Sequence, residues 1–495
     1  MPIANPMNSR EFLQPIDRTA LALILVLTLL ISLLASSGEH AAPRVRDFSW
    51  RNQQLGAQDT AFTMTFTRPM DRASVEANLV IEPLLPGKIS WAGRRMAYTL
   101  ISPAPYGTEF QVKLAEAREQ FSQKKDRSSL IKPFVGKFST RDRAFIYLGI
   151  EGKEQGQLIL YNLTKNQKIF LTPEKLSVID FKTYPAGDRI LFSAQDRLSI
   201  QKGTLEPQLY TVTTGINYNL AGKSDTRPVP SGVIELVLDS QNYQNLKFDL
   251  SADGQTIVVQ RVNRRNPAEL GLWTLRPGSE PQLLQAQPGG DFLIAPDSTS
   301  VAMAQGQGIV ILPLQPEADP LEFLAKFGMV LNFTKDGSGA VMVKFNTDYT
   351  RSLFFVTNQG VEKELLRTTG SILSCEFAPQ KQNLYCLLTQ LVKGEQYQEQ
   401  PYLAEIDLQE SKVLPLLLLP IQRDIQMSLS PDGFALLFDQ IVSDPKPSTA
   451  DGLRTNEGQA IATSHLWLMP LTPAATGKLK PEQLPLPGLH PRWLP

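Results

Sequence analysis

The fold class is decided by the stretch MSLSPDGFALLF, residues 427–438. It places a short apolar strand before the tetrapeptide Ser430-Pro431-Asp432-Gly433 and a second apolar strand after it. Asp and Gly favour a tight turn, because Asp caps the local main chain and Gly accepts dihedral angles that other residues disfavour. The stretch therefore predicts two antiparallel strands joined by a short turn.

The same pattern recurs from Phe145 onward. Successive turns are separated by 44, 39, 44 and 52 residues, and each follows an apolar strand. A third strand that begins with an aromatic residue or Leu is predicted in every repeat. Such intervals fit one four-stranded propeller blade per repeat. The turns are Ser251–Gly254, Ala295–Ser298, Thr334–Gly337, Ala378–Lys381 and Ser430–Gly433, with a degenerate copy at Tyr184–Gly187.

The sequence contains seven segments that fit the third strand of a repeat. This number favours seven blades, with six as the alternative. The final segment, Leu489–Pro495, has the composition of a first strand but no turn after it. We expect it to complete the blade that begins at Phe145–Thr172 and so to close the ring, which hides an edge that could aggregate. Residues 144–495 are therefore predicted to form a β-propeller.

The Asp-Gly turns resemble the TolB-type propeller repeat, which is typical of periplasmic and other exported bacterial proteins. The resemblance rests on recurrence, because Gln380 replaces the Asp of one copy and Ser298 replaces the Gly of another. It implies a domain that acts outside the cytoplasm.

Residues 43–140 are predicted to form a β-sandwich. Phe62, Met64 and Phe66 alternate with threonines, and five to seven short strands fit within about a hundred residues. The block resembles the bacterial Ig-like domains of S-layer and other exported proteins, which implies a spacer or adhesion module without a catalytic residue. The residues that carry this resemblance are Phe62, Phe66, Pro69, Met70, Asp71, Ile81, Pro83, Gly87, Trp91, Tyr106, Gly107, Thr108 and Val112, with Phe110 where the family often has Tyr.

An uncharged apolar run covers Thr19–Ala35. Its 17 residues would span about 25 Å as a helix, and Ser36 and Ser37 extend it. The run predicts a transmembrane helix over residues 19–37 after an N-terminal tail of residues 1–18. A cleaved signal peptide is the alternative, which the long leader with its Glu11 and Asp17 disfavours. Arginines flank the run on both sides, so only the downstream domains indicate that the C-terminal part lies outside the cytoplasm.

The charge balance of the chain argues against nucleic acid as a partner. Lysine and arginine together number 49, as do aspartate and glutamate, so no excess of positive charge attracts a phosphate backbone. The basic stretch Arg261–Arg265 is interpreted as solvated loop charge.

The sequence offers little material for catalysis. Its three histidines, His40, His465 and His490, are widely separated, and no nucleophile elbow, phosphate loop or dinucleotide fingerprint occurs. The repeated aspartates of the turns are interpreted as turn caps rather than cation ligands. We therefore predict a non-enzymatic protein with no catalytic, metal or cofactor residues.

Two cysteines, Cys375 and Cys386, lie symmetrically about a turn at Pro379–Gln382. They would face each other across a hairpin, where the Cα atoms of a non-hydrogen-bonded pair come close enough for a disulfide. Two buried thiols that pack as small apolar side chains are the alternative. Oxidation would support an extracytoplasmic location.

One outer strand is apolar on both faces, VLPLLLLPI at residues 413–421. Because one face of an outer strand normally meets water, its leucines are a candidate partner surface, with cover by neighbouring loops as the alternative. These leucines are Leu414, Leu416, Leu417, Leu418 and Leu419.

Together these features predict a single-pass membrane protein of the bacterial envelope that displays a sandwich and a propeller and binds a protein or another envelope component. Fold alone does not assign function. Two alternatives stay open: a carboxylate-dependent glycan enzyme in the propeller channel, and a scaffold that faces the cytoplasm.

Overall fold

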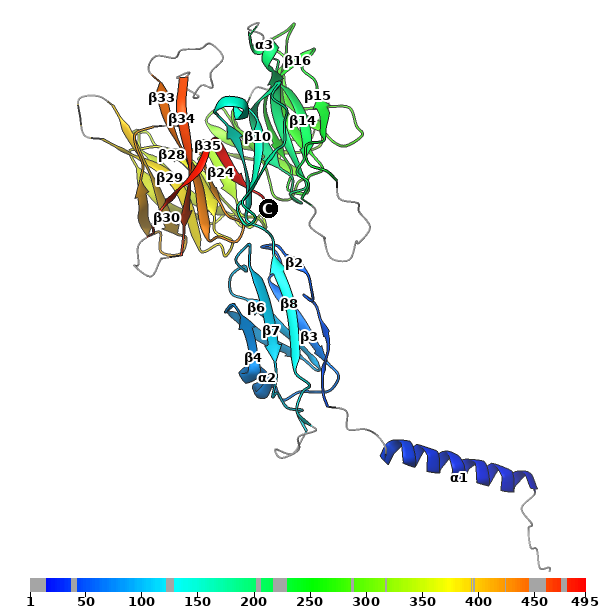
Figure 1. Ribbon diagram of the computed structural model, residues 1–495. Helices are drawn as coiled ribbons and strands as arrows, with labels where there is room; N and C mark the ends of the chain where they lie inside the picture. The colour runs from blue at the N-terminus through cyan, green and yellow to red at the C-terminus, as the bar shows by residue number, and fades with distance from the viewer. Residues whose placement is uncertain are drawn as a thin grey trace, which may run out of the picture.

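The computed structural model describes residues 15–36, 42–121, 129–201, 206–216, 229–285, 289–316, 318–392, 394, 397–422, 424–444, 460–472 and 479–495. A narrow β-sandwich lies below a wider β-propeller, and a separate helix precedes the sandwich (Figure 1). The described elements are β-strands, except for three α-helices and one 3₁₀ turn. One of the helices is α1, which lies apart from the two folded units, and the other two are short.

The N-terminal helix α1 covers Pro15–Ser36. Among the described residues, no helix combines the length and apolar character needed to cross a membrane. The predicted transmembrane helix over residues 19–37 is therefore wrong.

The sandwich is built from two four-stranded sheets, in the orders β1-β3-β6-β5 and β2-β8-β7-β4. Phe62, Met64 and Phe66 on β3 are buried in its core, as their spacing predicts, together with Phe110 and Val112 on β7. The strands are β1 Val45–Phe48, β2 Gln54–Leu55, β3 Ala61–Phe66, β4 Leu79–Glu82, β5 Gly87–Ala92, β6 Arg95–Leu100, β7 Glu109–Leu114 and β8 Phe134–Thr140.

A short helix, α2 (Arg72–Asn78), follows β3. The sequence predicts only a turn at Arg68–Asp71. Asp71 instead caps this helix, because its carboxylate accepts a hydrogen bond of 2.9 Å from the Ser74 main-chain N–H. Val75 packs the helix onto the sandwich core.

The propeller contains five four-stranded sheets and one seven-stranded sheet. The four-stranded sheets are the second to sixth blades, and each begins with its innermost strand. Their strands are β12 Leu176–Thr183, β13 Arg189–Asp196, β14 Gln208–Thr213, β15 Ile234–Leu238; β16 Tyr243–Leu250, β17 Ile257–Asn263, β18 Leu270–Leu275, β19 Gln282–Gln285; β20 Phe292–Ile294, β21 Ser300–Gln305, β22 Gly308–Pro313, β23 Glu322–Leu324; β24 Met329–Phe333, β25 Gly339–Phe345, β26 Arg351–Thr357, β27 Glu362–Thr368; and β28 Ile372–Phe377, β29 Asn383–Leu391, β30 Glu399–Asp407, β31 Val413–Leu418.

The seven-stranded sheet combines the first and seventh blades, because both use the last strand. Its order is β11-β10-β9-β35-β34-β33-β32. The described sheets thus count as seven blades, the number that the sequence favours. The remaining elements are β9 Ala144–Gly149, η2 Gly152–Glu154, β10 Leu158–Asn162, β11 Gln167–Phe170, α3 Arg197–Gln201, β32 Met427–Leu429, β33 Ala435–Asp444, β34 Ala460–Pro470 and β35 Glu482–Trp493.

Strand β35 closes the ring. Its first half pairs with β34, with His465 opposite Pro487, and its second half pairs with β9, with Leu489 opposite Leu148 and Trp493 opposite Phe145. One strand is therefore the outer strand of the seventh blade and the inner strand of the first. The expected pairing of the chain end with the blade begun at Phe145 is confirmed.

The turn aspartates have the structural role that the sequence predicts. The Asp253 carboxylate accepts a hydrogen bond of 2.9 Å from the Gln255 N–H, and that of Asp297 accepts one of the same length from the Thr299 N–H. Each carboxylate thus satisfies the main chain of its own turn. In the described part of the chain, no group of three or more His, Cys, Asp or Glu is placed to hold a metal ion.

Arg261 differs from its prediction as a solvated loop residue. It is buried on β17, where its guanidinium carbon lies 4.6 Å from the Tyr243 ring centroid and 5.3 Å from that of Trp273. Its Nε donates to the Asn245 side-chain oxygen at 3.1 Å. Burial lowers the pKa of Arg261. The guanidinium is held by aromatic faces and one amide rather than by water.

Candidate functional site

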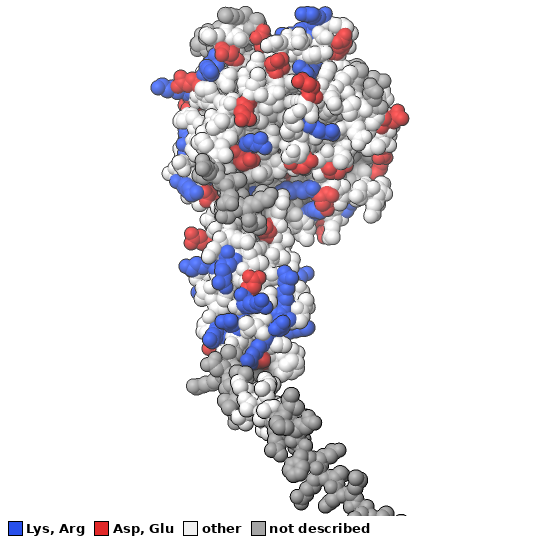
Figure 2. All heavy atoms as spheres, turned by 90° about the vertical axis from the view of Figure 1, so that its right-hand side faces the viewer, with Lys and Arg blue, Asp and Glu red and all other residues white. Residues whose placement is uncertain are grey.

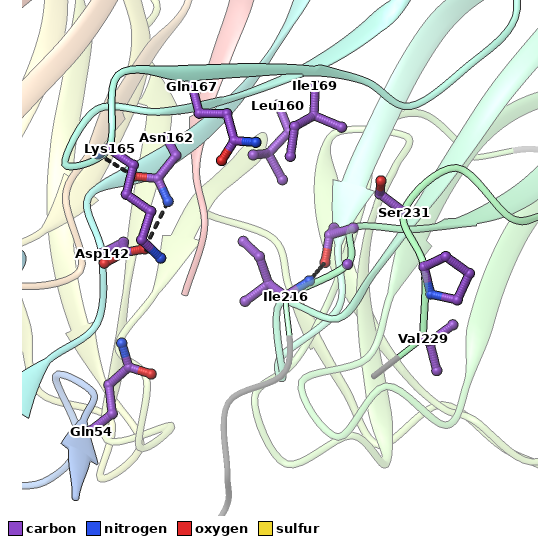
Figure 3. Close-up of a pocket in the computed structure, with 13 residues that line it drawn as sticks. Gln54, Asp142, Leu160, Asn162, Lys165, Gln167, Ile169, Ile216, Val229 and Ser231 are labelled. Carbon is purple, nitrogen blue, oxygen red and sulfur yellow. Dashed lines mark hydrogen bonds and ion pairs between the residues drawn. The ribbon is translucent and has the colours of Figure 1, made fainter. Parts of the chain in front are cut away.

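A cleft of about 560 Å³ opens on the face of the propeller that is turned toward the sandwich. It lies between the first and second blades, and the sandwich contributes Gln54 from β2 to its wall (Figure 3). The lining residues are Gln54, Asp142, Leu160, Asn162, Lys165, Gln167, Ile169, Thr214, Gly215, Ile216, Val229, Pro230 and Ser231.

One end of the cleft is polar. Lys165 forms an ion pair of 2.7 Å with Asp142, and the Asn162 side-chain amide donates to the same carboxylate at 2.7 Å. Partial burial acts to raise the pKa of Asp142, but the hydrogen bonds from Lys165 and Asn162 outweigh it and the pKa is lowered. The Lys165 side chain stays largely exposed. A charged partner group can therefore reach its ammonium.

The opposite end of the cleft is apolar. Leu160 and Ile169 come from the first blade, and Ile216 and Val229 come from the loop between β14 and β15 of the second blade (Figure 3). The cleft thus offers an apolar wall beside a single ion pair, which suits a ligand with an apolar side chain next to a charged group.

The second-blade wall is fixed by hydrogen bonds of two threonine hydroxyls, one beside Ile216 and one beside Pro230. The Thr214 hydroxyl donates to the Gly187 carbonyl at 2.7 Å, and the Ile216 N–H donates to that hydroxyl at 3.2 Å. On the other side, the Thr213 hydroxyl donates to the Pro230 carbonyl at 2.6 Å. Both ends of the loop are therefore held to the blade.

The sandwich is fastened to the propeller beside this cleft. The Tyr106 main-chain N–H donates to the carboxylate of Asp432 at 2.8 Å, and Asp432 is only 1% exposed. Arg141 donates to the main-chain oxygen of Pro495 at 2.8 Å. Gly107, with a φ of +71°, lies so close to Thr164 that a Cβ atom would approach its hydroxyl to 2.7 Å. Gln54 is therefore held at a defined place relative to the first blade.

The two cysteines lie directly opposite each other on β28 and β29, at a Cα–Cα distance of 4.1 Å, and are joined by a disulfide. Both are buried in the sixth blade, away from the cleft residues. Their role there is to connect the innermost strand of the blade to its neighbour.

The candidate leucine surface on β31 is only partly exposed. Leu414 and Leu418 face solvent, the latter 56% exposed, whereas Leu419 is 4% exposed and buried against the seventh blade. Leu416 and Leu417 are half-buried and pack on the same cluster. The structure therefore does not bring these five leucines together as one exposed face, and none of them lines the cleft.

The cleft residues escape the sequence reasoning because they are ordinary loop residues far apart in the chain. Asp142 and Ser231 line the same cleft only because two blades and the sandwich pack side by side. The nearest sequence signal is the Tyr106-Gly107-Thr108 motif, which marks the joint but not the cleft.

Comparisons with known proteins give matches among solved structures alone. No protein-family model matches the sequence, and no curated protein matches it. The chain is similar to TolB from Acinetobacter baumannii, with 10% identity, 84% of this chain and 83% of that chain covered, and a TM-score of 0.39.

Two further similar structures are enzymes by name. Oligogalacturonate lyase from Vibrio parahaemolyticus shares 10% identity over 68% of this chain and 92% of that chain, with a TM-score of 0.43. Prolyl oligopeptidase B from Galerina marginata shares 9% identity over 71% of this chain and 52% of that chain, with a TM-score of 0.45. No activity is assigned to this chain from these proteins.

Proposed function

We propose that this chain is an extracytoplasmic binding or scaffold protein that holds a segment of a protein or another envelope component in the cleft between its first two blades and its sandwich. The observation that carries the proposal is the lining of the cleft by both folded units, with Lys165 and Asp142 at one end and Ile216 and Val229 at the other. The sandwich acts as an Ig-like spacer that also completes the cleft wall.

Photocrosslinking from the apolar wall tests this proposal. A photoreactive residue at Val229, which is 54% exposed, is expected to give a discrete adduct in the native host, because a bound segment contacts that wall. Ile216→Asp is expected to reduce the adduct about tenfold, since it places a charge where an apolar side chain lies half-buried in the wall.

Val361 provides the matched control. It is 59% exposed and lies in the corresponding loop of the fifth blade, between β26 and β27. Equal adducts from Val229 and Val361, or none from either, would contradict a specific cleft.

The extracytoplasmic part of the proposal is supported by the disulfide between Cys375 and Cys386, because such bonds persist in oxidising compartments. We expect both cysteines to be oxidised in cells. Acid-quenched cells, denatured and treated with a maleimide polymer, should show no gel shift before reduction and a shift for two thiols after it. A full shift without reductant would favour the cytoplasm-facing alternative.

The glycan-enzyme alternative has no specific observation in its favour. Two inner-strand carboxylates that could serve it bind neighbouring blades: Asp249 pairs with Lys182 at 3.1 Å and accepts from the Ile294 N–H at 2.9 Å. Glu376 accepts from the Leu429 N–H at 2.9 Å and lies 3.3 Å from Arg492. We therefore propose binding rather than catalysis as the function.

A further inference from the structure

The sandwich carries an excess of positive charge that the whole-chain balance conceals. Residues 43–141 hold 16 lysines and arginines against nine aspartates and glutamates, although the whole chain has 49 of each. Lysines and arginines gather on the face of the sandwich seen in Figure 2, while both signs are interspersed on the propeller above it. The argument against polyanionic partners therefore does not extend to this unit.

Five of these cations lie on two neighbouring segments, residues 44–51, which contain β1, and residues 132–137, which lead into β8. They are Arg44, Arg46, Arg51, Lys132 and Lys137, which we call the basic edge. Main-chain hydrogen bonds join its two sides, from the Lys132 N–H to the Pro43 carbonyl at 2.8 Å and from the Asn52 N–H to the Lys137 carbonyl at 2.8 Å.

All five residues of the basic edge are exposed. No carboxylate in the described part of the chain lies within ion-pair distance of any of them. Arg51 packs its guanidinium 5.6 Å from the Phe134 ring centroid and so stays beside the edge. An alternative explanation is that charged side chains at the edge of a sheet prevent aggregation. That role does not require all the charges to be positive. A row of unpaired like charges attracts an anionic partner.

The shape of the molecule decides what kind of anion fits. The sandwich is narrower than the propeller above it (Figures 1 and 2). A flat anionic bilayer laid along the basic face would also have to face the propeller, where acidic and basic side chains are interspersed. A flexible chain can lie along the edge, where Lys132 and Lys137 alone are separated by about 17 Å of extended main chain.

We propose that the basic edge binds a linear polyanion, a polymer with a phosphate or carboxylate group on each repeat. Arginine suits both groups, because its planar guanidinium donates two parallel hydrogen bonds to them. Binding by five such contacts releases counterions, so that affinity falls by about 100-fold between 50 and 200 mM salt, taking about 0.7 ion per contact for a flexible single chain.

The test measures binding of long-chain inorganic polyphosphate to the purified full chain at both salt concentrations, with alginate as a carboxylate probe. The variant Arg44→Glu/Arg46→Glu/Lys132→Glu should weaken binding at least tenfold, and its salt dependence should fall to about sevenfold as two contacts remain. Arg72→Glu/Lys88→Glu/Lys153→Glu makes the same change of net charge at exposed positions elsewhere and should bind nearly as the wild type does.

Several outcomes would overturn the proposal. They are failure of the wild type to bind either polymer, an equal loss in the control variant, and a salt dependence that the basic-edge substitutions leave unchanged. Binding to vesicles that contain anionic lipid, but to neither polymer, would favour a membrane surface instead. Thermal melts of both variants establish that each is folded, so that a loss of binding is assigned to the removed charges.

Discussion

Removing Leu489–Pro495 is expected to unfold the propeller. This segment supplies the inner strand of the first blade and buries Leu489, Trp493 and Leu494. Full burial of a large apolar side chain contributes about 2–3 kcal/mol, so three of them approach the roughly 5–15 kcal/mol by which a domain is ordinarily stable. The truncated chain should lose its cooperative thermal transition, as measured by circular dichroism, and should expose apolar surface to a fluorescent dye.

A peptide with the sequence of residues 482–495 provides the control for this truncation. Its residues 489–495 should restore the transition when the peptide is added in excess, because they can pair with β9 as the second half of β35 does. Trp493→Ala, which removes one buried side chain, should lower the melting temperature without abolishing the transition. A truncated chain that melts within a few degrees of the full chain would show that the ring is stable without its closure.

The closure was predictable from sequence because its signal is local. Leu489–Pro495 has the composition of an inner strand, and the blade begun at Phe145 needs such a strand. What the sequence does not reveal is that one strand serves two blades. That arrangement depends on the bulge between Leu489 and Arg492, where His490 adopts a φ of +51°. No residue pattern identifies such a bulge in advance.

Other features depend on contacts between distant residues, and sequence reasoning missed them. Arg261 resembles one of several loop cations in the sequence, but the strand register places it opposite Asn245 and Gly271, between two aromatic rings. The candidate cleft likewise needs two blades and the sandwich to meet. The apolar run in α1 gave the opposite error, since composition alone predicted a membrane span that the described helix does not provide.

The contacts that hold the sandwich to the propeller involve the segment that closes the ring. The attachment of the sandwich therefore depends on ring closure. Arg141 of the segment between the units binds Pro495, the residue that follows the closing strand and Leu494. Asp432, which fastens Tyr106, lies in the turn of the seventh blade that the same strand completes. Loss of the closure is therefore expected to release the sandwich from these contacts as the propeller unfolds.

Asp439 holds the crossing of β35 from one blade to the next. Its side chain is fully buried on β33; one carboxylate oxygen accepts from the Gln426 N–H at 2.6 Å and the other from the His490 N–H at 2.8 Å. Asp439→Ala leaves two partly buried main-chain donors without their carboxylate partner, and an unsatisfied buried donor costs about 1–3 kcal/mol. We expect a loss of about 3 kcal/mol in the free energy of unfolding, measured by urea denaturation.

The pH dependence of the free energy of unfolding separates the effect of the charge on Asp439 from the effect of its hydrogen bonds and packing. Burial raises the pKa of Asp439, although the imidazole of His490 and the two N–H donors oppose the shift. A carboxyl whose pKa is higher in the folded protein stabilises it as pH falls through that raised value, and the gain is complete below the ordinary pKa near 3.8.

The wild type should therefore gain more stability than Asp439→Asn when the pH is lowered from neutral toward the ordinary carboxyl pKa, because the amide does not titrate. His490→Asn, which keeps the main-chain donor and tolerates the positive φ, controls for the imidazole. Parallel pH profiles for the wild type and Asp439→Asn would mean that the carboxylate is already solvated in the folded protein, and that the crossing of β35 is held by its hydrogen bonds alone.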